Sequence, residues 1–150
     1  MLNDSITAAI ACIALLGLAS PAGAQAFSAT RAVIAIVTDD LYVGEAVGHL
    51  SGAGTLAIHA QKNPAVTCIG EFTSSAALGG SGQLHCSDGS VATFKFTRLT
   101  AFTGHGVGSF GGGAMSFVYG LSATEAAPYL KLPEGKTLKY NGIDLALADL

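Results

Sequence analysis

Short runs of strand-forming residues, separated by glycines, recur along most of the chain and restrict its fold more than any other feature. Of the 150 residues, 20 are glycine, and the runs between them are rich in β-branched and aromatic residues. Such runs, bounded by Gly, Ser, Asn or Asp, predict strands that are joined by tight turns. We expect strands within residues 31–38, 41–50, 54–60, 65–72, 81–87, 90–99 and 114–120.

Three dipeptides predict where the chain reverses. Asp39-Asp40 follows the first expected strand, and Asp88-Gly89 lies between two others. Asp-Gly and Asn-Gly are typical of hairpins, because a type I′ turn requires positive φ at both central residues. Asn141-Gly142 therefore predicts a last hairpin near the C-terminus. We expect this hairpin to return the end of the chain to the sheet.

The chain changes character at Ser122. Glu125 follows three residues later, and this spacing is that of a capping box, which predicts a short helix. No amphipathic helix is indicated between the N-terminal segment and this point. The sequence thus predicts an all-β fold, with a single antiparallel sheet of about eight or nine strands, curled or closed into a small barrel, and one short helix near the C-terminus.

An almost unbroken apolar run, residues 6–19, lies near the N-terminus. It is shorter than the roughly 20 residues that span a bilayer, and Ala24 and Ala26 supply the small residues of a cleavage site. We expect residues 1–26 to be a signal peptide and residues 27–150 to form a single all-β domain without a membrane span. There are two alternatives to a cleaved signal peptide: the apolar run could be a buried helix, or a lipid could be attached at Cys12.

Two cysteines, Cys68 and Cys86, remain after the expected cleavage site. A pair of cysteines in an exported chain predicts one disulfide, and the compartment would be the periplasm or the exterior. A hairpin centred on Ala77, with its turn within residues 74–80, would set the two cysteines directly opposite each other.

The glycines also follow a repeating pattern. Residues 42–54 can be aligned with residues 68–82, and residues 94–108 form a third, fainter copy at a spacing of about 26 residues. The aligned positions are Gly44 with Gly70, Glu45 with Glu71, Gly52 with Gly80, and Gly54 with Gly82. Each copy would be one β-hairpin, with glycines where strands bend or approach closely. Chance alignment of glycines is the alternative.

This pattern resembles the MORN hairpin repeat. Residues 42–120 are also similar to small exported proteins of Gram-negative bacteria, which carry C-x-G-x-F, G-x-G, C-x-D-G, a second G-x-G and F-x-x-G. The matching residues here are Cys68, Gly70, Phe72, Gly80, Gly82, Cys86, Asp88, Gly89, Gly106, Gly108, Phe117 and Gly120. The resemblance implies a β-hairpin fold and an exported protein, and it implies no particular activity.

The composition and the motifs exclude several function classes. Only 11% of the residues are charged and the formal net charge is −3, so the basic surface that nucleic acid requires is missing. No G-x-S-x-G elbow occurs. Gly106, Gly108 and Gly111 have G-x-G-x-x-G spacing, but no helix is expected after them, so a turn is predicted there and no cofactor.

No catalytic set and no metal site are predicted. His85 and Cys86 are neighbours on an expected strand and would therefore point to opposite faces. The histidines form no H-x-H or H-x-x-x-H pair. The candidates for a ligand or surface site are His59, His85, Asp88 and His105, and the segments 74–80 and 100–106 are candidate binding loops. Most of the aromatic residues are expected in the core.

These observations favour an exported, non-catalytic β domain with a binding or structural role in the cell envelope. Its partner would be an unknown protein or envelope ligand. Two alternatives remain at this point. The first is an inhibitor of an exported hydrolase such as a lysozyme, and the second is a small hydrolase or metal-dependent enzyme.

Overall fold

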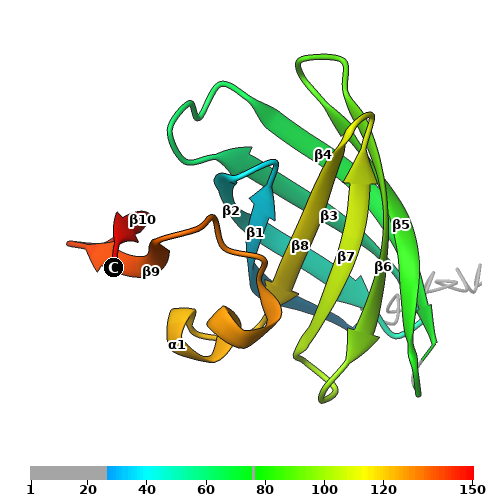
Figure 1. Cartoon of the computed structure of the whole chain (residues 1–150). Coiled ribbons are helices and arrows are strands. Elements are labelled where there is room, and N and C mark those ends of the chain that lie inside the picture. The colour runs from blue at the N-terminus through cyan, green and yellow to red at the C-terminus, as the bar shows by residue number, and fades with distance from the viewer. Residues whose placement is uncertain (1–26, 76) are drawn as a thin grey trace, which may run out of the picture.

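Eight antiparallel strands form a barrel (Figure 1). The barrel is closed, because its last strand pairs with its first. The computed structural model describes residues 27–75 and 77–150. Each strand of the barrel also pairs with the next along the chain. The strands are β1 Ser28–Val37, β2 Asp40–His49, β3 Ala53–Ala60, β4 Thr67–Ser75, β5 Gly79–Cys86, β6 Val91–Arg98, β7 Gly104–Phe110 and β8 Gly113–Tyr119. The predicted all-β barrel is confirmed, and the expected signal peptide, residues 1–26, lies outside the described residues.

Two predicted turns are shifted or differ in type. The turn between β1 and β2 consists of Thr38 and Asp39, which have φ of 46° and 69°, and Asp40 already belongs to β2. This pair of positive φ values fits the two-residue turns that match the twist of a hairpin. The turn after β5 has positive φ at Gly89 and not at Asp88. Instead, the Asp88 carboxylate accepts hydrogen bonds from the Ser90 backbone N–H and hydroxyl, at 2.9 and 2.6 Å.

The segment after β8 packs against the outside of the barrel. It contains α1 (Ala123–Ala126), η1 (Ala127–Tyr129), β9 (Lys136–Asn141) and β10 (Asp144–Asp149). The predicted capping box is present, since Ser122 and Glu125 exchange both hydrogen bonds. Figure 1 shows α1 beside the barrel, near β1 and β8. Apolar side chains of this segment cover the outer face of β1 and β8. These buried contacts are made by Ala123, Ala126, Leu130 and Leu145 with Ile34, Ile36, Leu41 and Val118.

The C-terminal hairpin corrects one prediction. Strands β9 and β10 pair with each other in a separate two-stranded sheet and do not extend the barrel. Residues 33–37 of β1 pair with β8 and close the barrel, so the edges that the first and last strands would otherwise offer there are already occupied. The hairpin is therefore held by side-chain packing. The turn itself is formed by Gly142 and Ile143, one residue later than expected.

Cys68 and Cys86 are directly opposite each other in the pairing of β4 with β5, and their sulfur atoms lie at disulfide-bond distance. The predicted partners and register are both confirmed. The pair lies at the end of the barrel that is filled by side chains, among them Val37, Ile58 and Leu84. Within the described residues, no helix is long and apolar enough to cross a membrane.

Candidate functional site

The other end of the barrel contains a cavity of about 450 Å³, at the lower end in Figure 1. This end is bounded by the start of β1 and by the turns between β2 and β3, β4 and β5, and β6 and β7. The described residues of the candidate binding segments 74–80 and 100–106 lie at this end, and both segments include residues of the adjoining strands. The cavity is lined by Phe27, Ala29, Arg31, Val33, Ala46, Gly48, His49, Leu50, Ser51, Gly52, Leu56, Phe72, Ser74, Phe94, Phe96, Arg98, Ala101, Phe102, Phe117 and Tyr119.

The cavity exists because small and large residues gather on different sides of the barrel. Strands β1 and β2 contribute Ala29, Ala46 and Gly48, which leave space in front of them. Strands β4, β6 and β8 contribute aromatic rings, which form an aromatic wall that continues around the interior to β8, the neighbour of β1. At the disulfide end, buried side chains such as Val37, Ile58, Leu84 and Phe110 fill the interior.

The aromatic wall depends on glycines in the neighbouring strands. Phe94 is paired with Gly82 on one side and Gly108 on the other, and Phe96 is paired with Gly80 and Gly106. A Cβ atom at any of these four glycines would lie closer than 3.0 Å to a backbone oxygen of a neighbouring strand. The G-x-G spacing noted in the sequence therefore places bare backbone beside each ring.

Edge-to-face contacts continue from ring to ring along this wall. The ring centroids of Phe72 and Phe96 are 5.6 Å apart, those of Phe96 and Tyr119 are 5.8 Å apart, and those of Phe94 and Phe117 are 5.4 Å apart. All three pairs are close to perpendicular. This is a favoured arrangement for aromatic side chains. The wall thus offers a continuous apolar surface to any molecule in the cavity.

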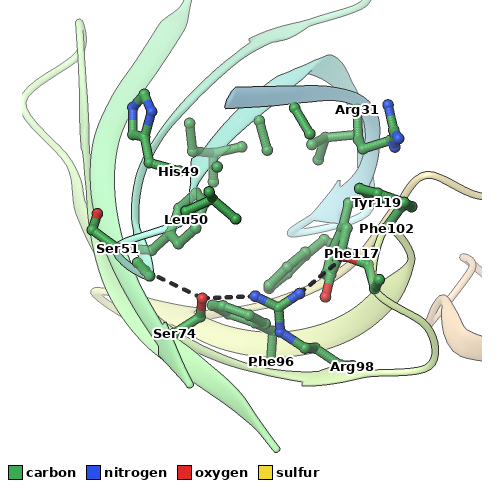
Figure 2. A pocket seen from close by; sticks show the side chains of 18 of the residues that line it. Arg31, His49, Leu50, Ser51, Ser74, Phe96, Arg98, Phe102, Phe117 and Tyr119 are labelled. Carbon is green, nitrogen blue, oxygen red and sulfur yellow. Dashed lines mark hydrogen bonds between the residues drawn. The ribbon is translucent and has the colours of Figure 1, made fainter. Parts of the chain in front are cut away.

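Arg98, at the end of β6, bridges the mouth of the cavity. Its guanidinium donates hydrogen bonds to the Ala101 carbonyl and the Ser74 hydroxyl, at 3.0 and 2.8 Å (Figure 2). It also donates to the Ser75 carbonyl at 3.1 Å. The Ser74 hydroxyl in turn donates to the Gly52 carbonyl at 3.2 Å. Three loops of the open end are joined in this way around one cation.

Tyr119 extends from β8 toward Arg98 (Figure 2). Its hydroxyl is buried and has no hydrogen-bond partner among the described residues. Burial raises the pKa of Tyr119 above its ordinary value of 10.0, and the nearby Arg98 opposes this only in part. The phenol is therefore neutral at physiological pH. A buried hydroxyl without a partner is costly, and it marks a place where a ligand atom could accept a hydrogen bond.

A second cation, Arg31, reaches the mouth from β1. Its guanidinium carbon lies 4.4 Å above the centroid of the Phe102 ring, so Arg31 contacts the loop between β6 and β7. His49, at the end of β2, also lines the cavity. Three large apolar side chains at the mouth, Phe27, Leu50 and Phe102, are 57%, 81% and 45% exposed. The entrance is therefore apolar with positive groups among the apolar ones.

Negative charge is missing from this site. No residue that lines the cavity is Asp or Glu. The salt bridges found in residues 27–75 and 77–150 join Lys62 to Asp40 and Lys136 to Asp149, and neither involves an arginine of the mouth. Within the described residues, the mouth is thus a local region of uncompensated positive charge in a chain whose formal net charge is −3.

Comparison with known proteins adds no relative. No family model, no curated protein and no solved structure matches the chain significantly. What the cavity can do is therefore argued from its own residues.

The four residues selected from the sequence lie outside the cavity. His85 is exposed on the outer face of β5, and His59 is half-buried on β3. Asp88 lies in the turn after β5, at the disulfide end. His105 stacks on Tyr129 of η1, with ring centroids 4.5 Å apart. Across the described part of the chain, no group of three or more His, Cys, Asp or Glu side chains could hold a metal ion.

Sequence reasoning missed Arg31, Arg98 and Tyr119 as site residues. A signal was present, because Arg98 continues the alternation of Phe94 and Phe96, and Tyr119 continues that of Phe117. Residues two apart in a strand share a face. A cation and a phenol in line with buried aromatic residues therefore indicate polar groups at the rim of an apolar interior.

Proposed function

We propose that this protein is an exported, non-catalytic binding protein that holds a small, mainly apolar molecule in the open end of its barrel. The observation that carries the proposal is the cavity of about 450 Å³ between the aromatic wall and the small residues of β1 and β2. Its volume falls within the range of about 300–1,000 Å³ typical of small-molecule sites. An eight-stranded barrel is also wide enough to hold one small ligand.

The polar groups at the mouth favour binding over nucleophilic catalysis. The Ser74 hydroxyl is engaged with Gly52 and Arg98, and the Ser51 hydroxyl accepts a hydrogen bond from the Ala53 backbone at 3.4 Å. A serine nucleophile needs a base within hydrogen-bond reach and a group that orients the base. His49, on the same rim, has no carboxylate beside it among the lining residues.

The disulfide supports the proposed compartment. Cys68 and Cys86 are paired at disulfide-bond distance, and such bonds persist mainly in oxidising environments. A periplasmic or secreted carrier, or a sensor in the cell envelope, would fit these features.

A neutral fluorescent probe tests the proposal. The chain contains no tryptophan, so the fluorescence of N-phenylnaphthylamine can be followed with little intrinsic background. We expect saturable binding at one site. Ala46 lines the cavity and Ala57 is exposed on the outside of β3. Ala46→Phe should fill the cavity and weaken probe binding by roughly tenfold or more, which corresponds to about 1.4 kcal/mol.

Ala57→Phe is the matched control, because it adds the same ring to the outer surface. Its affinity for the probe should equal that of the unmodified protein. The proposal fails if the unmodified protein does not bind the probe saturably, or if both folded variants bind it equally well.

A further inference from the structure

The mouth of the cavity indicates which chemical class of ligand the barrel takes. The inward residues of β6, β7 and β8 form layers that can be followed from the rim to the interior. Arg98, Gly104 and Tyr119 form the outermost layer, because Gly104 is paired with both of the others. Phe96 and Phe117 follow in the next layer, on either side of Gly106. Along this wall the polar groups therefore lie in the outermost layer, and the layer beneath it is apolar.

Two hydrogen-bond donors of the outermost layer are not fully used. A guanidinium has five N–H groups, and Arg98 uses three of them for Ser74, Ser75 and Ala101, which leaves two without a partner among the described residues. The Tyr119 hydroxyl is buried and without a partner in the described part of the chain. Both side chains line the cavity (Figure 2). An acceptor placed between them would receive a charge-assisted bond from Arg98 and a second bond from Tyr119.

The positive charge at the mouth indicates that the acceptor is anionic. Arg31 and Arg98 both lie at the mouth, and no carboxylate lines the cavity to balance them. Below them the cavity is enclosed mainly by aromatic and aliphatic side chains. A ligand that satisfies both parts has an anionic end and a long apolar end. A neutral ligand would leave the two cations without a counter-charge.

We propose that the ligand is a single-chain amphiphile with an anionic headgroup, a carboxylate or a phosphate monoester, whose head lies between Arg98 and Tyr119 and whose tail lies along the aromatic wall. Arg31 stands across the mouth and adds a second positive charge for the head. The exposed Leu50 and Phe102 cover the first part of the tail at the entrance. This inference rests on the proposed function, because it specifies the molecule that the cavity holds.

Displacement of N-phenylnaphthylamine by ligands with the same tail and different heads tests the inference. The competitors are dodecanoate, dodecyl phosphate, dodecanol and dodecyltrimethylammonium, each below the concentration at which it forms micelles. We expect at least one anion to bind roughly tenfold or more tightly than dodecanol, and the cation to bind more weakly than dodecanol. The stronger of the two anions identifies the headgroup.

The ratio of anion affinity to dodecanol affinity is the quantity that reports on the headgroup contacts. It should fall by about tenfold in Arg98→Gln and several-fold in Tyr119→Phe and Arg31→Gln, while the affinity for dodecanol changes little. Lys95→Gln removes a positive charge from the exposed outer face of the same strand and should leave the ratio unchanged. Because Arg98 also joins the loops, Tyr119→Phe and Arg31→Gln remain informative if Arg98→Gln does not fold.

The two proposals fail in different ways. If dodecanol displaces the probe as well as both anions do, or if the ratio is the same in Tyr119→Phe, Arg31→Gln and the unmodified protein, the anionic ligand is excluded while the apolar cavity site stands. If the probe does not bind saturably at all, the proposed function itself is overturned.

Discussion

Arg98 and Tyr119 lie on either side of Gly104 in three neighbouring strands at the barrel mouth. A cation and a phenol that has no hydrogen-bond partner among the described residues are thus separated by a residue without a side chain. The glycine is required for this arrangement. A Cβ atom at Gly104 would lie closer than 3.0 Å to the Tyr119 hydroxyl and to the Thr97 carbonyl oxygen. The geometry of the candidate site is thus set by the residue between its two polar groups.

We expect Gly104→Ala to lower the free energy of unfolding by about 1–3 kcal/mol, the usual cost of overpacking a closely packed interior. It should also displace the Tyr119 ring and weaken the binding of the probe. Urea unfolding and probe titration measure the two effects. Gly111→Ala is the control, because no atom lies within 4 Å of a Cβ at that turn position. Equal stabilities of the two variants would contradict the prediction.

Removal of the disulfide should separate stability from binding. Cys68 and Cys86 close a loop with a sequence separation of 18, and a bond of this kind stabilises by about 2–4 kcal/mol. We expect the variant with both cysteines replaced by alanine to lose about this much free energy of unfolding. Because the pair lies at the filled end of the barrel, the affinity of the folded variant for the probe should not change. Loss of probe binding in a variant that remains folded would show that the two ends are coupled.

The C-terminal hairpin should contribute to stability through one face only. Leu145 of β10 is 7% exposed and contacts the cluster on the outside of β1, whereas Ile143 in the turn of the same hairpin is 94% exposed. Leu145→Ala should lower the free energy of unfolding by about 2–4 kcal/mol, and Ile143→Ala should change it by less than about 0.5 kcal/mol. Calorimetry of the two variants provides the comparison. Similar melting temperatures would mean that the hairpin does not stabilise the barrel.

Stability should decrease in acid. The Ser90 hydroxyl and backbone N–H lower the pKa of Asp88 below its ordinary 3.8, and the Ser122 backbone N–H and hydroxyl lower that of Glu125 below 4.5. Since these carboxyls bind protons less readily in the folded state, their contribution is present above the ordinary pKa values and is lost as the pH falls through the lowered ones. The free energy of unfolding, measured in urea at a series of pH values, should be nearly constant above about pH 5 and fall below about pH 4.

Asp88→Asn and Glu125→Gln should each flatten this acid limb, and the double variant should flatten it further. An unchanged slope in the double variant would show that other carboxyls account for the loss of stability.

Much of the fold could be predicted because its determinants are local. The capping box at Ser122 and the runs of β-branched residues are each contained in a few positions. The register of β4 with β5 followed from the positions of Cys68 and Cys86 alone, because partners in a hairpin have a constant sum of residue numbers. The prediction that the last hairpin joins the sheet was wrong because it depends on a contact between distant parts of the chain. Whether a sheet offers a free edge depends on the pairing of its first strand with its eighth.

The cavity could not be predicted because it depends on strands that are distant in the sequence. Alternation shows that Phe94, Phe96 and Arg98 share a face, but not that the face points inward. The space itself results from Ala29 and Ala46 lying opposite that wall, which requires the barrel to close. The histidines were candidates because imidazoles often bind metals or transfer protons. The polar groups of the mouth are an arginine and a tyrosine, and they lie on strands whose other inward residues belong to the hydrophobic core.

The pairing of glycines with rings also limits how this barrel can diverge. Gly82 and Gly80 have no room for a side chain even where a smaller residue replaces Phe94 or Phe96, because a Cβ atom at either glycine would lie closer than 3.0 Å to a backbone oxygen of β4. The backbone itself therefore keeps these two positions as glycine on the aromatic side of the interior. Changes in the ligands that such a barrel holds should instead arise from substitutions in β1 and β2, where a larger or smaller residue can replace Ala29 or Ala46 independently.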